Sequence, residues 1–395
     1  MRAQVVRWLS REVHRVLGSR LTPREAACVY GWPDHEENSL FAAVELAERT
    51  PLRVTLLAGD PLAAARYLAV ADPRGAPVEI VGKNSARGIW RASRASVLLF
   101  THGLYGSPDL TRRKLVVNLW HGFGPKANDN VVFSASIPFN LMTCDTPLWA
   151  HAAAISLGVP HARLVQTGNP RQVALRTPPP PAALERLDLT SSFVLWMPTY
   201  RSSNGRSGPV WQDAPALSDQ AGNGRDAVST LAELAAAAGV RLVVKPHPLD
   251  ADRYEASGLR VITTDDVFAA GMTLYQFIGA SSAMISDYSS VWVEYLGLDR
   301  PLLLFCPDIA DYVDGRGLSE PYMTDIAADL IVEQMDDIPP FLEAVRSGAD
   351  WRPGGRAAVR EALQLAPDDE ELPCLAEVVM EELRQRRVQR HSSAR

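Results

Sequence analysis

Short apolar runs alternate with helical segments along the chain. In the first half, apolar runs bounded by turn residues predict strands at residues 27–32, 53–59, 78–82, 95–103, 115–122, 139–146 and 163–168. Between them, helical patterns are found at residues 37–49, 60–70 and 147–157. Strands that alternate with helices are typical of a parallel sheet, because a parallel neighbour can be reached only by a long crossover.

The alternation resumes after four consecutive prolines, Pro178 to Pro181. Apolar runs predict strands at residues 193–201, 241–248, 259–266, 283–290 and 301–308, and a helix is predicted at 228–239. Prolines cannot donate backbone hydrogen bonds, so the proline run favours an extended linker. We therefore predict an α/β fold with two Rossmann-like, doubly wound domains that face each other across a cleft, as in GT-B proteins. The predicted parts are an N-terminal domain at 1–176, a linker at 177–190, a C-terminal domain at 191–375 and a basic C-terminal helix or tail at 376–395.

The composition narrows the class of protein. Of the 395 residues, 47% are hydrophobic and 22% are charged, which is typical of a soluble globular protein. A net charge of -6 argues against nucleic acid as a partner. The four cysteines form no C-x-x-C pair, which suits a reducing cytoplasm, and no apolar run approaches the roughly 20 residues of a spanning helix. We expect a cytoplasmic protein that needs no cofactor, and we predict no metal-binding residues.

The first 21 residues have the pattern of an amphipathic helix. Apolar residues recur at helical spacing beside Trp8, namely Val6, Leu9, Val13, Val16 and Leu17. The charged residues of this segment are Arg2, Arg7, Arg11, Arg15, Arg20 and the single acid Glu12. Two interpretations stay open: the helix packs on its own domain with a solvated basic face, or it lies on an anionic membrane surface.

Two histidines stand at predicted strand ends. In "WHGFGPK" (120–126), His121 precedes a glycine, which lets the backbone approach a ligand closely, and Lys126 can neutralise an anionic group. Histidine is the commonest general base, because its ordinary pKa is closest to neutrality. In "KPHP" (245–248), two prolines hold His247, a good donor to a phosphate oxygen. Each histidine has a structural hydrogen-bonding role as its alternative.

A cluster of hydroxyls follows another predicted strand, in "SDYSS" (286–290). Ser289 and Ser290 would open the next helix, where backbone N–H groups favour an anion, although a simple N-cap also explains them. Arg201 and Arg316 are candidate phosphate ligands, and each of them can equally be a surface charge or part of a salt bridge. The sequence contains neither a P-loop nor a G-x-G-x-x-G motif after the first strand.

Six segments in this order resemble the CDP-glycerol:poly(glycerophosphate) glycerophosphotransferase family of teichoic acid synthesis. They are "LWHGFGPK" (119–126), "TGNPR" (167–171), "MPTYR" (197–201), "KPHP" (245–248), "SDYSSVWVEYLGLDRPLLLFCPD" (286–308) and "DYVDGRG" (311–317). Two departures stand out: the family commonly has Thr and Leu near Phe123 and Gly124, and often Asp at Glu294. No family motif is evident before about residue 110.

The resemblance implies a GT-B transferase that uses CDP-glycerol, or a related CDP-alditol, and a polyol-phosphate or glycan acceptor that can be lipid-linked. His121 would be the general base, and His247 would contact the donor diphosphate. The phosphate-binding residues that the resemblance implies are Ser289, Ser290 and Arg316. Three further residues at predicted strand ends are expected beside them: Asp287, Arg201 and Lys245. Gly122 and Lys126 would lie on the acceptor side.

The expected activity is transfer of glycerol phosphate to an acceptor hydroxyl with release of CMP. The protein would work in the cytoplasm, with peripheral contact at the inner face of the plasma membrane as a further expectation. Two alternatives stay open. One is a GT-B glycosyltransferase that uses a nucleotide sugar, and the other is a nucleotide-binding protein without catalysis.

Overall fold

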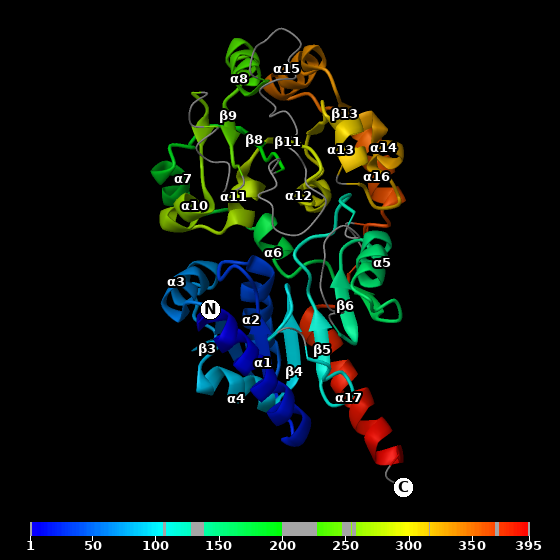
Figure 1. Cartoon of the computed structure of the whole chain (residues 1–395). Helices are drawn as coiled ribbons and strands as arrows, with labels where there is room; N and C mark the ends of the chain where they lie inside the picture. The colour runs from blue at the N-terminus through cyan, green and yellow to red at the C-terminus, as the bar shows by residue number, and fades with distance from the viewer. Residues whose placement is uncertain are drawn as a thin grey trace. The chain divides into compact units, whose positions relative to one another are not determined.

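The structure is a computed structural model that describes residues 2–105, 108–127, 138–199, 227–246, 254, 258–315, 317–367 and 371–393. The chain divides into two compact units. Unit 1 comprises Met1–His121, Phe133–Val173 and Ala366–Arg395, and unit 2 comprises Gly122–Val132 and Ala174–Leu365. Each unit is a parallel sheet covered by helices, as the alternating pattern predicts (Figure 1).

Unit 1 contains a seven-stranded sheet in the order β3-β2-β1-β4-β5-β6-β7. Every neighbouring pair of strands is parallel. The strands are β1 (Arg24–Tyr30), β2 (Arg53–Ala58), β3 (Glu79–Gly82), β4 (Ala95–Phe100), β5 (Leu115–Asn118), β6 (Leu141–Cys144) and β7 (Arg163–Gln166). The helices are α1 (Arg2–Arg20), α2 (Glu37–Arg49), α3 (Pro61–Ala71), α4 (Ala86–Arg94), α5 (Pro147–Ser156) and α17 (Leu375–Ser393).

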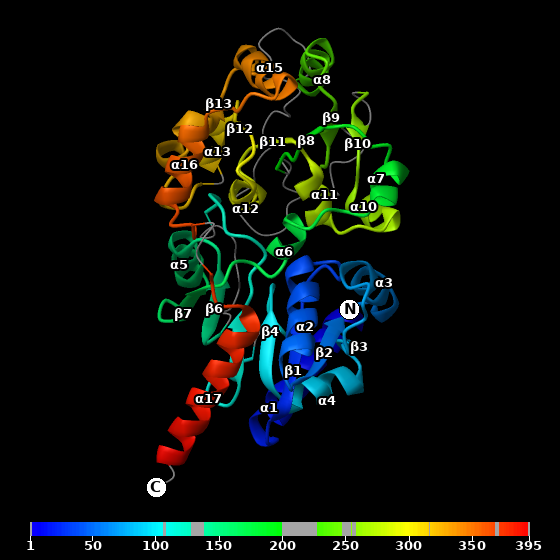
Figure 2. The same ribbon diagram turned by 180° about the vertical axis from the view of Figure 1, so that it is seen from behind.

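Successive residues of β1 point to opposite faces of this sheet, because side chains alternate along a strand. Val29 belongs to one buried cluster with Leu40 of α2 and Val379 of α17. Cys28 belongs to another cluster with Ala92 of α4. Figure 2 shows α17 running beside α2, and Figure 1 shows α1 beside α4. Two helical layers therefore cover the faces of the sheet.

Unit 2 repeats this topology with a six-stranded sheet in the order β10-β9-β8-β11-β12-β13. The neighbouring strands are again parallel. The strands are β8 (Val194–Trp196), β9 (Leu242–Val244), β10 (Arg260–Val261), β11 (Ala283–Ser286), β12 (Leu302–Phe305) and β13 (Ile331–Val332). The longer helices are α8 (Ala227–Ala237), α15 (Pro339–Ser347) and α16 (Pro353–Ala362).

Short helices connect these elements. They are α6 (Gln172–Leu175), α7 (Pro181–Arg186), α10 (Thr264–Ala270), α11 (Leu274–Ala280), α12 (Val291–Tyr295), α13 (Ile309–Gly315) and α14 (Met323–Ile326). The 3-10 turns are η2 (Leu296–Leu298), η3 (Ala328–Leu330) and η4 (Met335–Asp337). The strand β13 is too short, at two residues, to leave a periodic signal in the sequence.

The two units differ in their bounds from the domains that the sequence pattern predicts. The expected linker at 177–190 lies within unit 2, where α7 begins at Pro181 and buries Ala183. The Arg186 guanidinium also donates to the Ala270 carbonyl at 2.6 Å. The expected C-terminal tail is part of unit 1, because Leu375, Ala376 and Val379 of α17 enter its core. Apolar burial, rather than chain order, decides both placements.

Candidate active site

In unit 1 the strand order reverses beside β1, at the pair β1 and β4. Ligands of open parallel sheets bind at such a point, beyond the carboxyl ends of the strands. The loop after β1 carries Glu36, the loop after β4 carries His102, and the loop after β5 carries His121. These loops come from strands that are hydrogen-bonded neighbours, so residues distant in the sequence meet at one edge of the sheet.

The loop that carries His121 is strained and tightly held. Trp120 has a φ of 53°, in the left-handed region that costs a residue with a side chain about 1–3 kcal/mol. Its N–H donates to the Asn118 Oδ1 at 2.9 Å, and its carbonyl accepts from the Asn38 Nδ2 at 3.3 Å. Both amides are fully buried. The backbone just before His121 is therefore fixed in an unfavourable conformation, which is common at functional sites.

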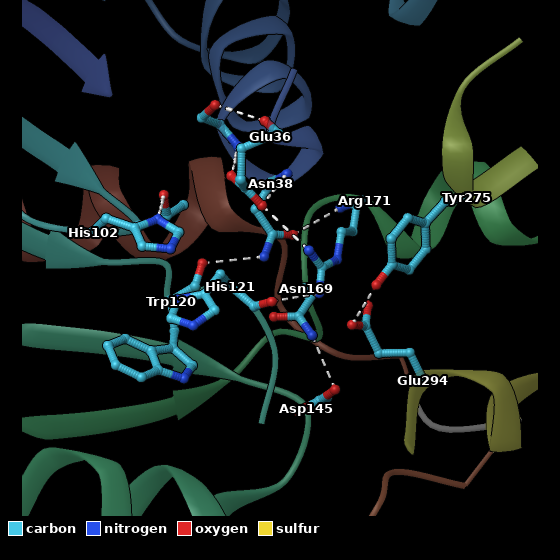
Figure 3. A network of polar contacts seen from close by, with 12 residues as sticks. Glu36, Asn38, His102, Trp120, His121, Asp145, Asn169, Arg171, Tyr275 and Glu294 are labelled. Carbon is cyan, nitrogen blue, oxygen red and sulfur yellow. Dashed lines mark hydrogen bonds and ion pairs between the residues drawn. The ribbon is translucent and has the colours of Figure 1, made fainter. Parts of the chain in front are cut away.

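Arg171, the last residue of "TGNPR", fixes the next carbonyl (Figure 3). Its Nη2 donates to the His121 carbonyl at 2.9 Å, and its Nη1 pairs with the Glu36 Oε1 at 3.2 Å. The Arg171 and Glu36 side chains are only 9% and 6% exposed. Glu36 also caps α2 by accepting from the N–H groups of Asn38 and Ser39. A buried ion pair contributes little net stability, so its value here lies in geometry.

His102 lies against the face of His121. The ring centroids are 4.2 Å apart with an interplanar angle of 17°. The Trp120 ring lies 4.3 Å from the His121 ring. Burial, with the nearby cations Arg171 and Lys83, lowers the pKa of His102 from 6.5 to about 4. The ring beside the candidate base is thus neutral at physiological pH.

Unit 2 has an equivalent reversal point between β8 and β11. Asp287, directly after β11, is 2% exposed and joins the two loops there. Its carboxylate accepts from the Thr199 N–H at 3.0 and 2.9 Å and from the Thr199 Oγ1 at 2.6 Å. The Ser289 N–H donates to the same carboxylate at 3.2 Å. Asp287 therefore shapes the loop through these hydrogen bonds, and its expected contact with the donor phosphates stays a prediction.

The rest of the "SDYSS" loop is also pinned. The Tyr288 hydroxyl donates to the buried Asp308 at 2.8 Å, and its ring stacks on Tyr312 of α13. Ser290 is the N-cap residue of α12, yet its side chain makes no capping hydrogen bond. The Ser290 hydroxyl therefore does not act as an N-cap in this structure.

The glycine-rich turn after His121 packs on this loop within unit 2. A Cβ at Gly124 would lie 2.7 Å from both the Cα and the Cβ of Ser290. The turn is held by backbone bonds on either side of Lys126: the Ser319 N–H donates to the Pro125 carbonyl at 2.7 Å, and the Ala127 N–H to the Gly317 carbonyl at 3.1 Å. Gly122 and Lys126, expected on the acceptor side of the N-terminal domain, thus belong to unit 2.

The other predicted site residues have separate placements. Lys245 directly follows β9, next to β8, at the carboxyl edge of the unit 2 sheet. Arg201, His247 and Arg316 lie outside the described residues.

Within the described residues, no group of three or more His, Cys, Asp or Glu side chains is placed to hold a metal ion. Glu294, the position that departs from the family pattern, is buried and accepts from the Tyr275 hydroxyl at 2.8 Å (Figure 3).

Sequence reasoning missed three residues of the unit 1 site: Glu36, Asn38 and His102. One signal for His102 was present, since "THG" ends an apolar run just as "WHG" does. Glu36 and Asn38 look like ordinary residues of a helix start, and only the fold brings them to the His121 loop.

Known proteins resemble this chain in sequence and in fold. The profile of the family described as CDP-Glycerol:Poly(glycerophosphate) glycerophosphotransferase matches residues 74–362. The chain belongs to this family. A teichoic acid ribitol-phosphate primase from Bacillus spizizenii is 32% identical over 89 residues, which span 22% of this chain and 22% of that protein.

Solved structures also resemble this glycerophosphotransferase family member. Two structures of the wall teichoic acid polymerase TagF match it with TM-scores of 0.64 and 0.63, at 15% and 16% identity. Both matches cover 95% of this chain and 94% of the other. At this identity the likeness concerns the fold, which is of the GT-B type, as the sequence predicts.

Proposed function

We propose that the protein transfers an alditol phosphate, in the first instance glycerol phosphate, from a CDP-linked donor to a hydroxyl of a polyol-phosphate or glycan acceptor. The acceptor oxygen attacks the β-phosphorus of the donor. A new P–O bond forms, the bond to CMP breaks, and the acceptor proton passes to His121. Family membership supports the donor class. No cofactor or metal enters this proposal.

The observation that carries the proposal is the construction around His121. Two buried amides hold the strained Trp120, and the buried Arg171 holds the His121 carbonyl. A histidine with only a packing role does not require this degree of fixation, whereas a general base must be held close to its proton. Ser289 and Ser290 would donate to the donor phosphates, with His247 and Arg316 contributing further charge stabilisation.

A donor panel tests the reaction class. We would incubate the protein and a polyol-phosphate acceptor with CDP-glycerol, CDP-ribitol or UDP-N-acetylglucosamine, and then measure CMP and UDP by chromatography. CDP-ribitol belongs in the panel because the curated relative is named for ribitol phosphate. We expect CMP together with a lengthened acceptor. Release of UDP alone would instead indicate a glycosyltransferase, and nucleotide binding without turnover would indicate a non-catalytic protein.

We also propose that α1 holds the protein at the inner face of the plasma membrane. Among the side chains of α1 that the structure describes, the buried positions are Ser10, His14 and Gly18. Val16 and Leu17 are half-buried. The apolar residues nearer the start of the helix point outward instead, with exposed fractions for Val5, Val6, Trp8, Leu9 and Val13 of 50%, 45%, 60%, 48% and 43%. This arrangement is the reverse of an ordinary surface helix, which buries its apolar face.

Charge complements this outward apolar surface. Arg11 and Arg15 of α1 are about half exposed, at 49% and 57% of their side-chain areas. Basic residues beside apolar ones favour an anionic lipid surface, where the apolar side chains enter the headgroup region. Within the described residues, no helix is long and apolar enough to cross the bilayer. The proposed contact is therefore peripheral, and it would suit a lipid-linked acceptor.

Sedimentation with vesicles tests this contact. We expect the protein to pellet with phosphatidylglycerol-containing vesicles and not with phosphatidylcholine vesicles, and to be released by salt. The double variant Trp8→Ser, Leu9→Ser should stay in the supernatant. Leu62→Ser is the matched control, because Leu62 of α3 is 80% exposed and lies outside α1. Equal pelleting of the double variant and the control would exclude α1 as the contact.

A further inference from the structure

The stacked pair of histidines in unit 1 follows directly from strand register. Phe100 of β4 pairs with Asn118 of β5, so the residues that follow both strands emerge side by side. His102 and His121 occupy this position, with ring centroids 4.2 Å apart and nearly parallel planes. Trp120, on the same strand end, lies 4.3 Å from the His121 ring. The His121 ring is thus bounded by flat aromatic surfaces.

His102 is itself held in place by its neighbours. Its Nδ1 lies 2.9 Å from the Thr101 Oγ1, and its ring meets the edge of Trp32 at 5.6 Å between centroids. The charged and titratable groups that act on it are Arg171, Lys83 and His121. Burial and two of these groups, which are cations, lower the pKa of His102 to about 4. The His102 ring is therefore uncharged at neutral pH.

We infer that His102 is a positioning residue for His121. The flat face of the His102 ring fixes the orientation of the His121 imidazole. The stacked ring leaves His121 little freedom to rotate, so its basic nitrogen stays directed at the acceptor hydroxyl. Because His102 is neutral, the proton that His121 gains does not meet a second positive ring. The π face of the neutral His102 ring instead attracts the positive charge that forms on His121. This inference rests on the proposed transfer reaction.

Two substitutions of similar size separate the flat face from the volume. His102→Phe keeps a ring that stacks but cannot carry a proton, whereas His102→Leu fills the space without a flat face. We expect His102→Leu to lower kcat by roughly 10²-fold with the KM for the CDP-linked donor unchanged, since misplacement by about 1 Å costs that much. His102→Phe should restore kcat to within about threefold, with the acid limb of its pH profile unchanged, because a stacked neutral ring is all that is required.

A double-mutant cycle distinguishes positioning from a merely structural role. If His102 acts only through His121, then His102→Leu should have no further effect in a His121→Ala background. A full additional loss in that background would overturn the inference. So would wild-type turnover by His102→Leu, or a loss by His102→Phe as large as that of His102→Leu.

Nuclear magnetic resonance tests the stacking of His102 on His121 without an activity assay. The ring current of His102 should displace the His121 Cε1–H signal, which is identified by its disappearance in His121→Gln. His102→Leu should move this signal and His102→Phe should largely keep its position. A wild-type protein that transfers nothing would refute the proposed function, while an unmoved His121 signal in His102→Leu would refute the stacking itself.

Discussion

Replacement of Gly124 by alanine directly perturbs the contact between the turn after His121 and the "SDYSS" loop. The added Cβ would lie 2.7 Å from the Ser290 Cα and Cβ and 3.2 Å from its backbone nitrogen. Two of these are backbone atoms, which cannot rotate away as the end of a flexible side chain can. Either the loop or the turn must therefore move.

The size of the effect follows from these distances. Non-bonded carbon atoms prefer about 3.5–4.0 Å, so a 2.7 Å approach is about 1 Å too close. Overpacking of this kind typically costs about 1–3 kcal/mol. If the cost falls on the conformation of Ser290 that binds the donor, CDP-glycerol should bind roughly 5–150-fold more weakly.

Isothermal titration with CDP-glycerol and urea unfolding together measure where this cost falls. We expect Gly124→Ala to weaken binding while the fold persists. Gly354→Ala is the matched control, because a Cβ there meets nothing within 4 Å and the residue lies in the helix α16. That control should bind normally and gain stability, since alanine favours a helix. Normal binding and turnover by Gly124→Ala would show that the contact between this turn and Ser290 does not shape the donor site.

Two further predictions concern buried polar groups. Asp287→Asn should lower the free energy of unfolding by about 1.5–3 kcal/mol, because the amide cannot accept every hydrogen bond from Thr199 and Ser289; an unchanged urea midpoint would contradict this. Burial, with the Lys114 charge, lowers the pKa of His14 to about 3, so the unfolded chain binds a proton there below pH 6.5 and the folded chain does not. Between about pH 7.5 and about pH 5, wild type should lose about 2 kcal/mol more stability than His14→Leu in urea titrations, and equal losses would exclude this role for His14.

Periodicity predicted the two sheets well, because a strand that is buried on both faces leaves a continuous apolar run. The runs at 95–103 and 115–122 became β4 and β5, and the helical pattern at 37–49 became α2 with the same bounds. Periodicity carries no information on which sheet a helix joins. It therefore could not assign α17 to unit 1 or α7 to unit 2, since both assignments depend on tertiary burial.

The candidate site was predictable only where chemistry coincides with a strand end. His121 and Ser290 stand out for that reason. His102 also follows an apolar run, but its stacking on His121 depends on the pairing of β4 with β5, which the sequence does not show. The hydrogen bonds of Asp287 could not be predicted from the sequence, because its partner Thr199 is 88 residues away along the chain. Long-range pairs of this kind come from the register of the sheet.

Quantification of CMP released from CDP-glycerol, with wild type and His121→Ala side by side, decides whether His121 is the general base of the transfer. Wild type should form CMP and lengthened acceptor in equal amounts. Turnover by His121→Ala should be lower by about 10²–10⁴-fold, with binding of CDP-glycerol and the urea midpoint unchanged. Full turnover by His121→Ala would exclude His121 as the base, and a wild-type enzyme that releases no CMP would exclude the transfer itself.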